Sequence, residues 1–177
     1  IDIIDLKKYM VLFCRIMYFF ARNDAILVTM MIKEITNNKK QYLSLLLLAD
    51  EQESMVDKYL NRGKMYVLFE DNIAISECVV TDEGNKVLEL KNLATDPKYQ
   101  HQGYAQKLVE FIEQKYKQDI DILQVGTGDS PLTLPFYKKI GFKVSGRKRN
   151  FFVDNYDHPI FEAGKQLVDM IYLQKKL

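Results

Sequence analysis

The segment TDPKYQHQGYA (Thr95–Ala105) decides the fold, because it links a segment with strand character to one with the pattern of an amphipathic helix. The first N–H groups of a helix lack partners within the helix, and the macrodipole places about half a positive charge there. Gly103 lets the main chain approach a ligand closely, and Ala105 keeps the next contact small. The segment is therefore typical of a loop that binds a diphosphate through backbone amides, although a glycine before a helix can also be only a turn residue.

The sequence on both sides of this loop alternates strand and helix patterns. Before the loop we expect strands at 31–36, 65–70, 73–81 and 87–95, with two helices, around 43–47 and up to residue 60, after the first strand. Asp71-Asn72 predicts a tight hairpin between the second and third of these strands. After the loop we expect helices at 105–117 and 134–140 and strands at 120–126, 141–146 and 167–173, with a loop at 155–164 before the last strand. The order β-αα-βββ-α-β-α-β-β predicts an α/β fold of the mixed α+β kind, with a mixed central sheet and helices on both faces.

Composition limits the class of protein further. The chain has 177 residues, 47% of them hydrophobic and 28% charged, which suits one folded domain with a buried core and excludes disorder. Its formal net charge of +1 gives no reason to expect nucleic acid or a membrane as a partner. Its two cysteines, Cys14 and Cys78, supply neither a disulfide framework nor a zinc ligand set, so we expect a cytoplasmic, metal-independent protein.

Three segments resemble one known family. QHQGYA (Gln100–Ala105) matches the Q/R-x-x-G-x-G/A pattern of the GCN5-related N-acetyltransferases, the GNAT superfamily. LKNLATDP (Leu90–Pro97) resembles the family's fourth strand, and FYKKIGF (Phe136–Phe142) is similar to the FYxxxGF segment after its fifth strand. The segments occur in the family's order, and the resemblance to a small bacterial-type acetyltransferase runs from about Met31 to Leu173.

The resemblance implies a function and a set of binding residues. It implies that acetyl-CoA is the cosubstrate and that the acetyl group passes directly to a primary amine in a ternary complex. It places donors to the thioester oxygen and the pantetheine arm at the end of the fourth strand, and the diphosphate at the loop. The residues so assigned to acetyl-CoA are Leu93, Ala94, Thr95, Gln100, His101, Gln102, Gly103, Tyr104, Ala105 and Phe136.

Acyl transfer also needs proton acceptors and donors. An alkylamine of pKa about 10.4 must lose a proton before it attacks, so a base should line the site. Glu89 is the first candidate and Glu77 the second, each able to act through water, although either can simply be a solvated strand carboxylate. The resemblance places the proton donor to the departing thiolate at Tyr137, which can alternatively be a core aromatic.

The C-terminal part offers candidates for the acceptor site. His158 is conceivable as a base, but a loop histidine more often orders its loop. Glu162 can attract a cationic acceptor. Asp129 stands where related acetyltransferases often have asparagine, and a carboxylate is less suited than an amide to the polar arm of CoA. Four aromatic residues can wall an acceptor pocket or pack the sheet edge: Phe151, Phe152, Tyr156 and Phe161.

The first residues differ from the rest. We expect residues 1–29 to be an N-terminal extension and residues 30–177 to be the acetyltransferase domain. The apolar run Tyr9–Ala21 is only 13 residues long and contains Arg15, so it is too short to span a membrane. A signal peptide is disfavoured, and the extension is either an amphipathic helix docked on the domain or upstream sequence fused to a start at Met30 or Met31.

The sequence leaves two functional classes open. The first is an N-acetyltransferase acting on a small-molecule or peptide amine. The second is a non-catalytic module of the same fold that binds CoA or a protein partner. Acceptor identity has no readable code in the loops, and nothing in the sequence decides between a monomer and a homodimer.

Overall fold

A computed structural model describes residues 29–177 of the chain. The expected N-terminal extension therefore lies, apart from Thr29, outside the described residues. The strands are β1 (Met30–Ile35), β2 (Lys64–Glu70), β3 (Ile73–Asp82), β4 (Val87–Thr95), β5 (Ile122–Gly128), β6 (Lys143–Lys148), β7 (Phe161–Glu162), β8 (Lys165–Gln166) and β9 (Met170–Lys176). The helices are α2 (Leu43–Ala49), α3 (Glu53–Leu60), α4 (Tyr104–Tyr116), α5 (Thr133–Lys139) and α6 (Phe151–Asn155), with short 3₁₀ turns at η1 (Lys39–Tyr42) and η2 (Pro97–Tyr99).

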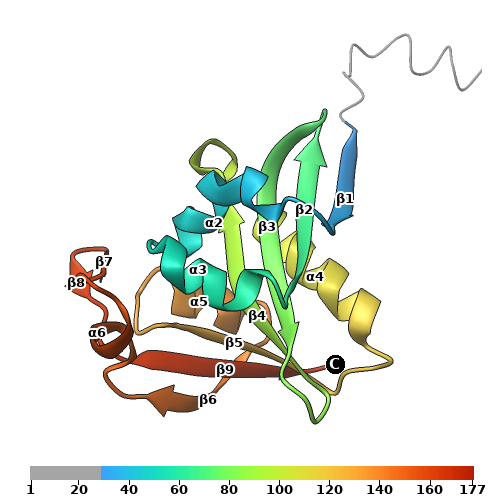
Figure 1. Ribbon diagram of the computed structural model, residues 1–177. Helices are drawn as coiled ribbons and strands as arrows, with labels where there is room; N and C mark the ends of the chain where they lie inside the picture. Colours follow the sequence, from blue (N-terminus) through green and yellow to red (C-terminus); the bar gives the residue numbers. More distant parts are fainter. Residues whose placement is uncertain (1–28) are drawn as a thin grey trace, which may run out of the picture.

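The main sheet has seven strands in the order β1-β2-β3-β4-β5-β9-β6. Every neighbouring pair is antiparallel except β4 and β5, which run parallel. Helices α2 and α3 cover one face and α4 and α5 the other (Figure 1). The predicted mixed sheet with helices on both faces is confirmed.

Local turn chemistry explains why the antiparallel part was predictable. The β2–β3 turn contains Asp71 and Asn72, whose φ angles are 48° and 66°. Two consecutive positive φ values match the right-handed twist of a two-residue hairpin, and asparagine and aspartate tolerate that conformation better than most residues. The predicted tight hairpin is therefore confirmed.

The C-terminal third differs from the expectation. The expected loop 155–164 contains the end of α6 and all of β7, and β8 follows directly to complete a small separate hairpin (Figure 1). The last strand begins at Met170 rather than at residue 167. Leu167 instead packs with Phe152 and Ile160 in a satellite core, so its apolar character reports that cluster and not the strand.

Two cores hold the layers together. The larger joins α4 and α5 to the sheet and includes fully buried Leu108, Ile112 and Leu123. The smaller joins α2 and α3 to the other face through residues such as Leu46 and Val56. Burial of each such side chain contributes about 1.5–3 kcal/mol, so the sheet is fixed from both sides.

The centre of the sheet opens where β4 and β5 separate. They pair only from Val87–Leu90 to Ile122–Val125. Beyond this point β4 bonds only to β3, and β5 only to β9. Lys91 is skipped in the β3–β4 register, which is a β-bulge at the point of divergence. The divergence leaves the inner edges of both strands without strand partners.

Two glycines let the C-terminal segment pass close to the diverging β5. A Cβ on Gly126 would lie 2.6 Å from Met170 Sδ, and one on Gly128 would lie 2.6 Å from Leu167 Cδ1. Larger residues here would push this segment outward. The small size of these two residues therefore determines how close the segment between α6 and β9 lies to β5.

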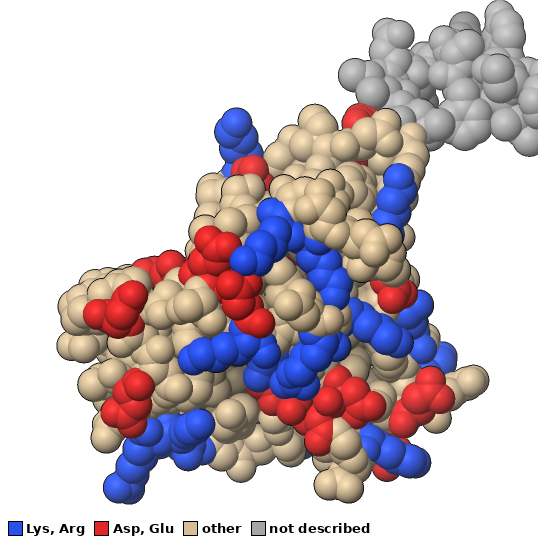
Figure 2. Space-filling view, in the orientation of Figure 1, with Lys and Arg blue, Asp and Glu red and all other residues tan. Residues whose placement is uncertain are grey.

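Charges of both signs are interspersed on the face formed by α2 and α3 (Figure 2). Lys and Arg side chains gather across the middle of this face, and Asp and Glu side chains lie beside them. Among the helices of residues 29–177, none is long and apolar enough to cross a membrane.

Gly63, between α3 and β2, tests how tightly the smaller core is packed. A Cβ there would lie 2.6 Å from Val79 Cγ1 and 3.0 Å from the Tyr59 carbonyl oxygen. We expect Gly63→Ala to lower the free energy of unfolding by about 1–3 kcal/mol in urea titrations, because the Tyr59 backbone cannot move away from the added methyl group. Gly146→Ala is the control, because its nearest atom would lie 3.9 Å away, and equal losses in both variants would contradict this packing argument.

Candidate active site

A cavity of about 190 Å³ lies between the diverging strands, and we call it the inter-strand cavity. It is lined by the end of β4, by β5 and by α5. Of the residues predicted to hold acetyl-CoA or to act in catalysis, five line it: Leu93, Ala94, Thr95, Gln100 and Tyr137.

A second cavity of about 290 Å³ adjoins the first, and we call it the aromatic cavity. Phe151, Phe152 and Tyr156 line it and also pack together in the satellite core, whereas Phe161 is exposed and outside its lining. The two cavities share several residues, among them Leu90, Lys91, Gly126, Thr127 and Glu162. A group in one cavity can therefore reach a group in the other.

The predicted diphosphate loop lies just beyond the inter-strand cavity. Gln100 is extended, whereas His101 and Gly103 are left-handed, with φ 61° and 85°. The first hydrogen bond closing the helix runs from Lys107 N to Gly103 O, and the N–H groups at 101–106 have no hydrogen-bond acceptor within residues 29–177. A Cβ on Gly103 would meet nothing within 4 Å, so the space before these amides is open. This arrangement suits an anion.

Two predicted binding residues direct their side chains elsewhere. Tyr104 is buried, and its hydroxyl donates to Glu70 Oε1 at 2.8 Å, which leaves only its backbone N–H for the loop. Phe136 packs edge-on against Tyr137 at 5.1 Å between ring centroids and lines neither cavity. The side chain of Gln100 donates to the Thr95 carbonyl and steadies the loop.

Tyr137 lies on α5 with its ring in the larger core and lines the inter-strand cavity. Burial, with smaller effects from Cys78 and Glu162, raises the pKa of Tyr137 above its usual range. The phenol therefore keeps its proton at neutral pH. Its hydroxyl makes no hydrogen bond to another described residue, so its proton can be donated to a ligand in the inter-strand cavity.

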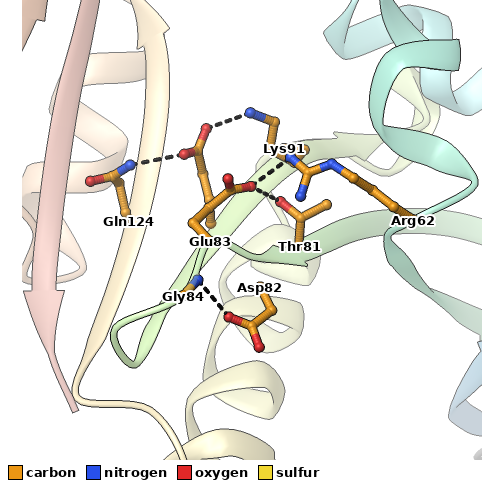
Figure 3. Close-up of polar contacts among 8 residues, drawn as sticks. Arg62, Thr81, Asp82, Glu83, Gly84, Lys91 and Gln124 are labelled. Carbon is orange, nitrogen blue, oxygen red and sulfur yellow. Dashed lines mark hydrogen bonds and ion pairs between the residues drawn. The ribbon is translucent and has the colours of Figure 1, made fainter.

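Glu89 is the better connected of the two base candidates. Its Oε1 lies 2.7 Å from Lys91 Nζ, and its Oε2 accepts from Gln124 Nε2 at 2.8 Å (Figure 3). Gln174 in turn donates to Gln124. Glu89 lines the aromatic cavity, but both of its oxygens are engaged and its charge is balanced.

Glu77 is buried completely and lies on the sheet face covered by α2 and α3, opposite Val67 of β2 and Ala94 of β4. Neither carboxylate oxygen has a hydrogen-bond partner among residues 29–177. Burial raises the pKa of Glu77 to about 8, and the nearby Ala94 amide offsets only part of this effect. Glu77 lines neither cavity, so it has no direct path to a substrate.

Asp129 and His158 are engaged outside the two cavities. The Asp129 carboxylate lies 3.7 Å from Arg147 and 3.4 Å from Lys165 Nζ. His158 is exposed and pairs with Asp157, and its Nε2 lies 3.8 Å from Glu51 Oε2. Both residues order loops in this structure.

One polar cluster of the aromatic cavity was missed by sequence reasoning. Asp50, between α2 and α3, accepts hydrogen bonds from the hydroxyls of Tyr59 at 3.2 Å and Tyr156 at 3.0 Å. Burial raises the pKa of Asp50, and the two phenols oppose the rise. Because Asp50 and Tyr156 are 106 positions apart, no local pattern could have linked them.

The comparisons with known proteins agree with this geometry. The family model described as "Acetyltransferase (GNAT) domain" matches residues 61–144. An uncharacterized N-acetyltransferase, YvbK, of Bacillus subtilis is 34% identical over 142 residues, which cover 79% of this chain and 90% of that protein. A GNAT family acetyltransferase from Elizabethkingia anophelis, solved with acetyl-CoA bound, is 35% identical with a TM-score of 0.79, covering 84% of this chain and 98% of that one. A Bacillus subtilis acetyltransferase solved in complex with CoA is 32% identical with a TM-score of 0.76, covering 84% and 99%.

Together with these relatives, the opened parallel strand pair beside a helix-terminal anion site identifies an acyltransferase that uses a CoA thioester. The chain belongs to the GNAT family. It is an acetyl-CoA-dependent N-acetyltransferase acting on an amine, which confirms the predicted class of enzyme and its cosubstrate.

The buried Glu77 predicts a pH dependence of stability. Its folded pKa, about 8, exceeds the ordinary 4.5, so its contribution is fully present below pH 4.5 and is lost as pH rises through about 8. We expect Glu77→Gln to remove this loss, and the stability of the variant relative to wild type should grow by a few kcal/mol between about pH 5 and about pH 8. Urea unfolding at both pH values measures the difference. Exposed Glu110→Gln is the control, and a pH-independent difference for Glu77→Gln would contradict the assignment.

Proposed function

We propose that acetyl-CoA binds with its diphosphate against the amides of residues 101–106 and its acetyl thioester in the inter-strand cavity. The observation that carries this proposal is the divergence of β4 from β5 directly ahead of that loop. The inner edge of Lys91–Thr95 has no strand partner in β5, and its main-chain groups suit the amide groups of a pantetheine arm. A backbone N–H in the same stretch suits the oxygen on which charge develops.

We place the amine acceptor in the aromatic cavity. The cavity is large enough for a small molecule or the end of a peptide. Its junction with the inter-strand cavity would place the amine of such a molecule next to the thioester. The amine nitrogen bonds to the acetyl carbon while the carbon–sulfur bond breaks, without an enzyme-bound acetyl group. Cys78 is not the nucleophile in this scheme, since it is buried and its burial raises the pKa of the thiol. We place the reaction in the cytoplasm, as the cysteine-poor composition indicates.

Tyr137 is the proton donor to the departing sulfur. It lines the inter-strand cavity, and its raised pKa keeps the phenol protonated until negative charge develops beside it. The core packing of its ring against Phe142 fixes the direction of the hydroxyl. Turnover tests this scheme: thiol should appear from acetyl-CoA only after an amine from a broad panel is added.

Removing the Tyr137 hydroxyl should slow catalysis and leave binding intact. We expect Tyr137→Phe to lower kcat by about 10²-fold or more, because the sulfur then leaves without its proton donor. The Kd for CoA from calorimetry should stay within about twofold, since the ring packing is unchanged. Unaltered kcat in this variant would remove Tyr137 from the mechanism.

Gly103 tests the diphosphate loop. Both Gly103 and Gly84 have left-handed φ values, of 85° and 78°, and at neither would a Cβ meet an atom within 4 Å. Alanine at either position should therefore destabilise the fold by a similar amount, about 1 kcal/mol. Only Gly103→Ala should weaken CoA binding, by about tenfold or more, because only this loop carries the free amides. Equal CoA affinities in the two variants would contradict the loop assignment.

A further inference from the structure

Glu162 occupies the junction of the two cavities. It lies on β7 and lines both the inter-strand cavity and the aromatic cavity. Tyr137 lines the same inter-strand cavity, so Glu162 and the proposed proton donor share one space. An amine that attacks the thioester from the aromatic cavity must pass this junction.

The carboxylate of Glu162 is also incompletely paired. Its Oε2 is buried and has no hydrogen-bond partner among residues 29–177. The three cationic side chains around the aromatic cavity all have other contacts. Lys58 lies against Met55 Sδ, Arg62 pairs with Glu83 at 2.7 Å, and Lys91 pairs with Glu89 at 2.7 Å (Figure 3).

The other carboxylates of the aromatic cavity are occupied or peripheral. Asp50 accepts from two tyrosine hydroxyls, and Glu89 is bonded at both oxygens. Glu51 is half exposed and faces His158. A buried, unpaired carboxylate oxygen is costly unless a ligand supplies the counter-charge, and within the described residues only Glu162 combines this state with both cavities.

We propose that Glu162 binds the ammonium group of the acceptor and takes its proton before attack. This inference rests on the proposed acetyl transfer and names the substrate class, a cationic primary amine carrying an apolar or aromatic body. The aromatic walls Phe151, Phe152 and Tyr156 would hold that body. Glu162 replaces Glu89 as the base in this scheme.

The proton balance of the step is complete. One N–H proton of the ammonium passes to the Glu162 carboxylate and then to solvent. The neutral nitrogen bonds to the acetyl carbon, and the carbon–sulfur bond breaks. Tyr137 gives its proton to the sulfur and regains one from the nitrogen through solvent, so amide, free thiol and one released proton result.

A dedicated contact positions the hairpin that carries Glu162. Lys165, its partner across β7 and β8, donates to the Asp129 carbonyl oxygen at 2.7 Å and lies 3.4 Å from the Asp129 carboxylate. The turn between the strands uses Ala163 and Gly164, both with positive φ. Asp129 therefore ties the hairpin to the end of β5, which accounts for a carboxylate at this position.

The kinetic test compares Glu162→Gln with Asp154→Asn, an exposed carboxylate on α6 outside both cavities. With 2-phenylethylamine as acceptor, Glu162→Gln should lower kcat/KM at neutral pH by about 10²-fold or more, and Asp154→Asn by less than about twofold. In the wild type, kcat/KM should be flat below the pKa of the amine, because Glu162 takes the proton of the bound ammonium ion. In Glu162→Gln it should rise tenfold per pH unit toward the pKa of the amine, because only neutral amine reacts.

The binding test uses calorimetry on the CoA-saturated enzyme. The 2-phenylethylammonium ion should bind Glu162→Gln at least about tenfold more weakly than wild type, whereas uncharged 2-phenylethanol should bind both alike. Wild-type turnover with unchanged kinetics and amine affinity in Glu162→Gln would overturn the Glu162 assignment and leave the acetyltransferase function standing. If no amine yields thiol, the proposed function fails, and equal affinities of the ammonium ion for the two enzymes would still overturn the Glu162 assignment.

Discussion

The separation of β4 from β5 after four paired residues is the constraint on which the rest of the structure depends. Each strand keeps its hydrogen bonds to its outer neighbour, so the sheet stays continuous at both sides while its centre opens. Main-chain groups left unpaired inside a protein cost about 1–3 kcal/mol each unless something satisfies them. The pantetheine arm that we propose to lie along this edge has amide groups of its own, which can satisfy the unpaired main-chain groups.

Three glutamates near this opening show how environment separates residues of one type. Glu89 forms an ion pair with Lys91 in the wall of the aromatic cavity. Glu77 is completely buried, and burial raises its pKa and favours the neutral acid. Glu162 is left without a partner at the junction of the cavities. The three residues differ in how exposed they are, in whether a cation lies beside them and in whether they line a cavity. None of these properties can be read from the amino-acid sequence.

The parts predictable from the sequence were those with local physical causes. The hairpin at Asp71 and Asn72 follows from backbone preferences, and α4 follows from its apolar stripe beginning at a glycine. The loop at 100–105 was recognisable because its sequence pattern includes Gly103, whose left-handed backbone conformation the loop requires. The interaction of Asp50 with Tyr156 joins residues 106 positions apart, and the bond of Glu89 to Gln124 joins neighbouring strands. Such contacts exist only once the sheet order is known, so the preference for Glu89 as the base could not be weighed from the sequence.

The C-terminal segment was predicted least well, and its construction explains why. It is held by a small cluster of Phe152, Ile160 and Leu167 and by the contact of Lys165 with Asp129, rather than by the main sheet. A segment anchored in this way can change its side chains without disturbing the strands that bind the cosubstrate. The same independence removes the regular periodicity on which sequence interpretation relies. The acceptor site that we propose therefore lies where secondary-structure patterns are weakest, and the cosubstrate site that we propose lies on the strands whose pattern is strongest.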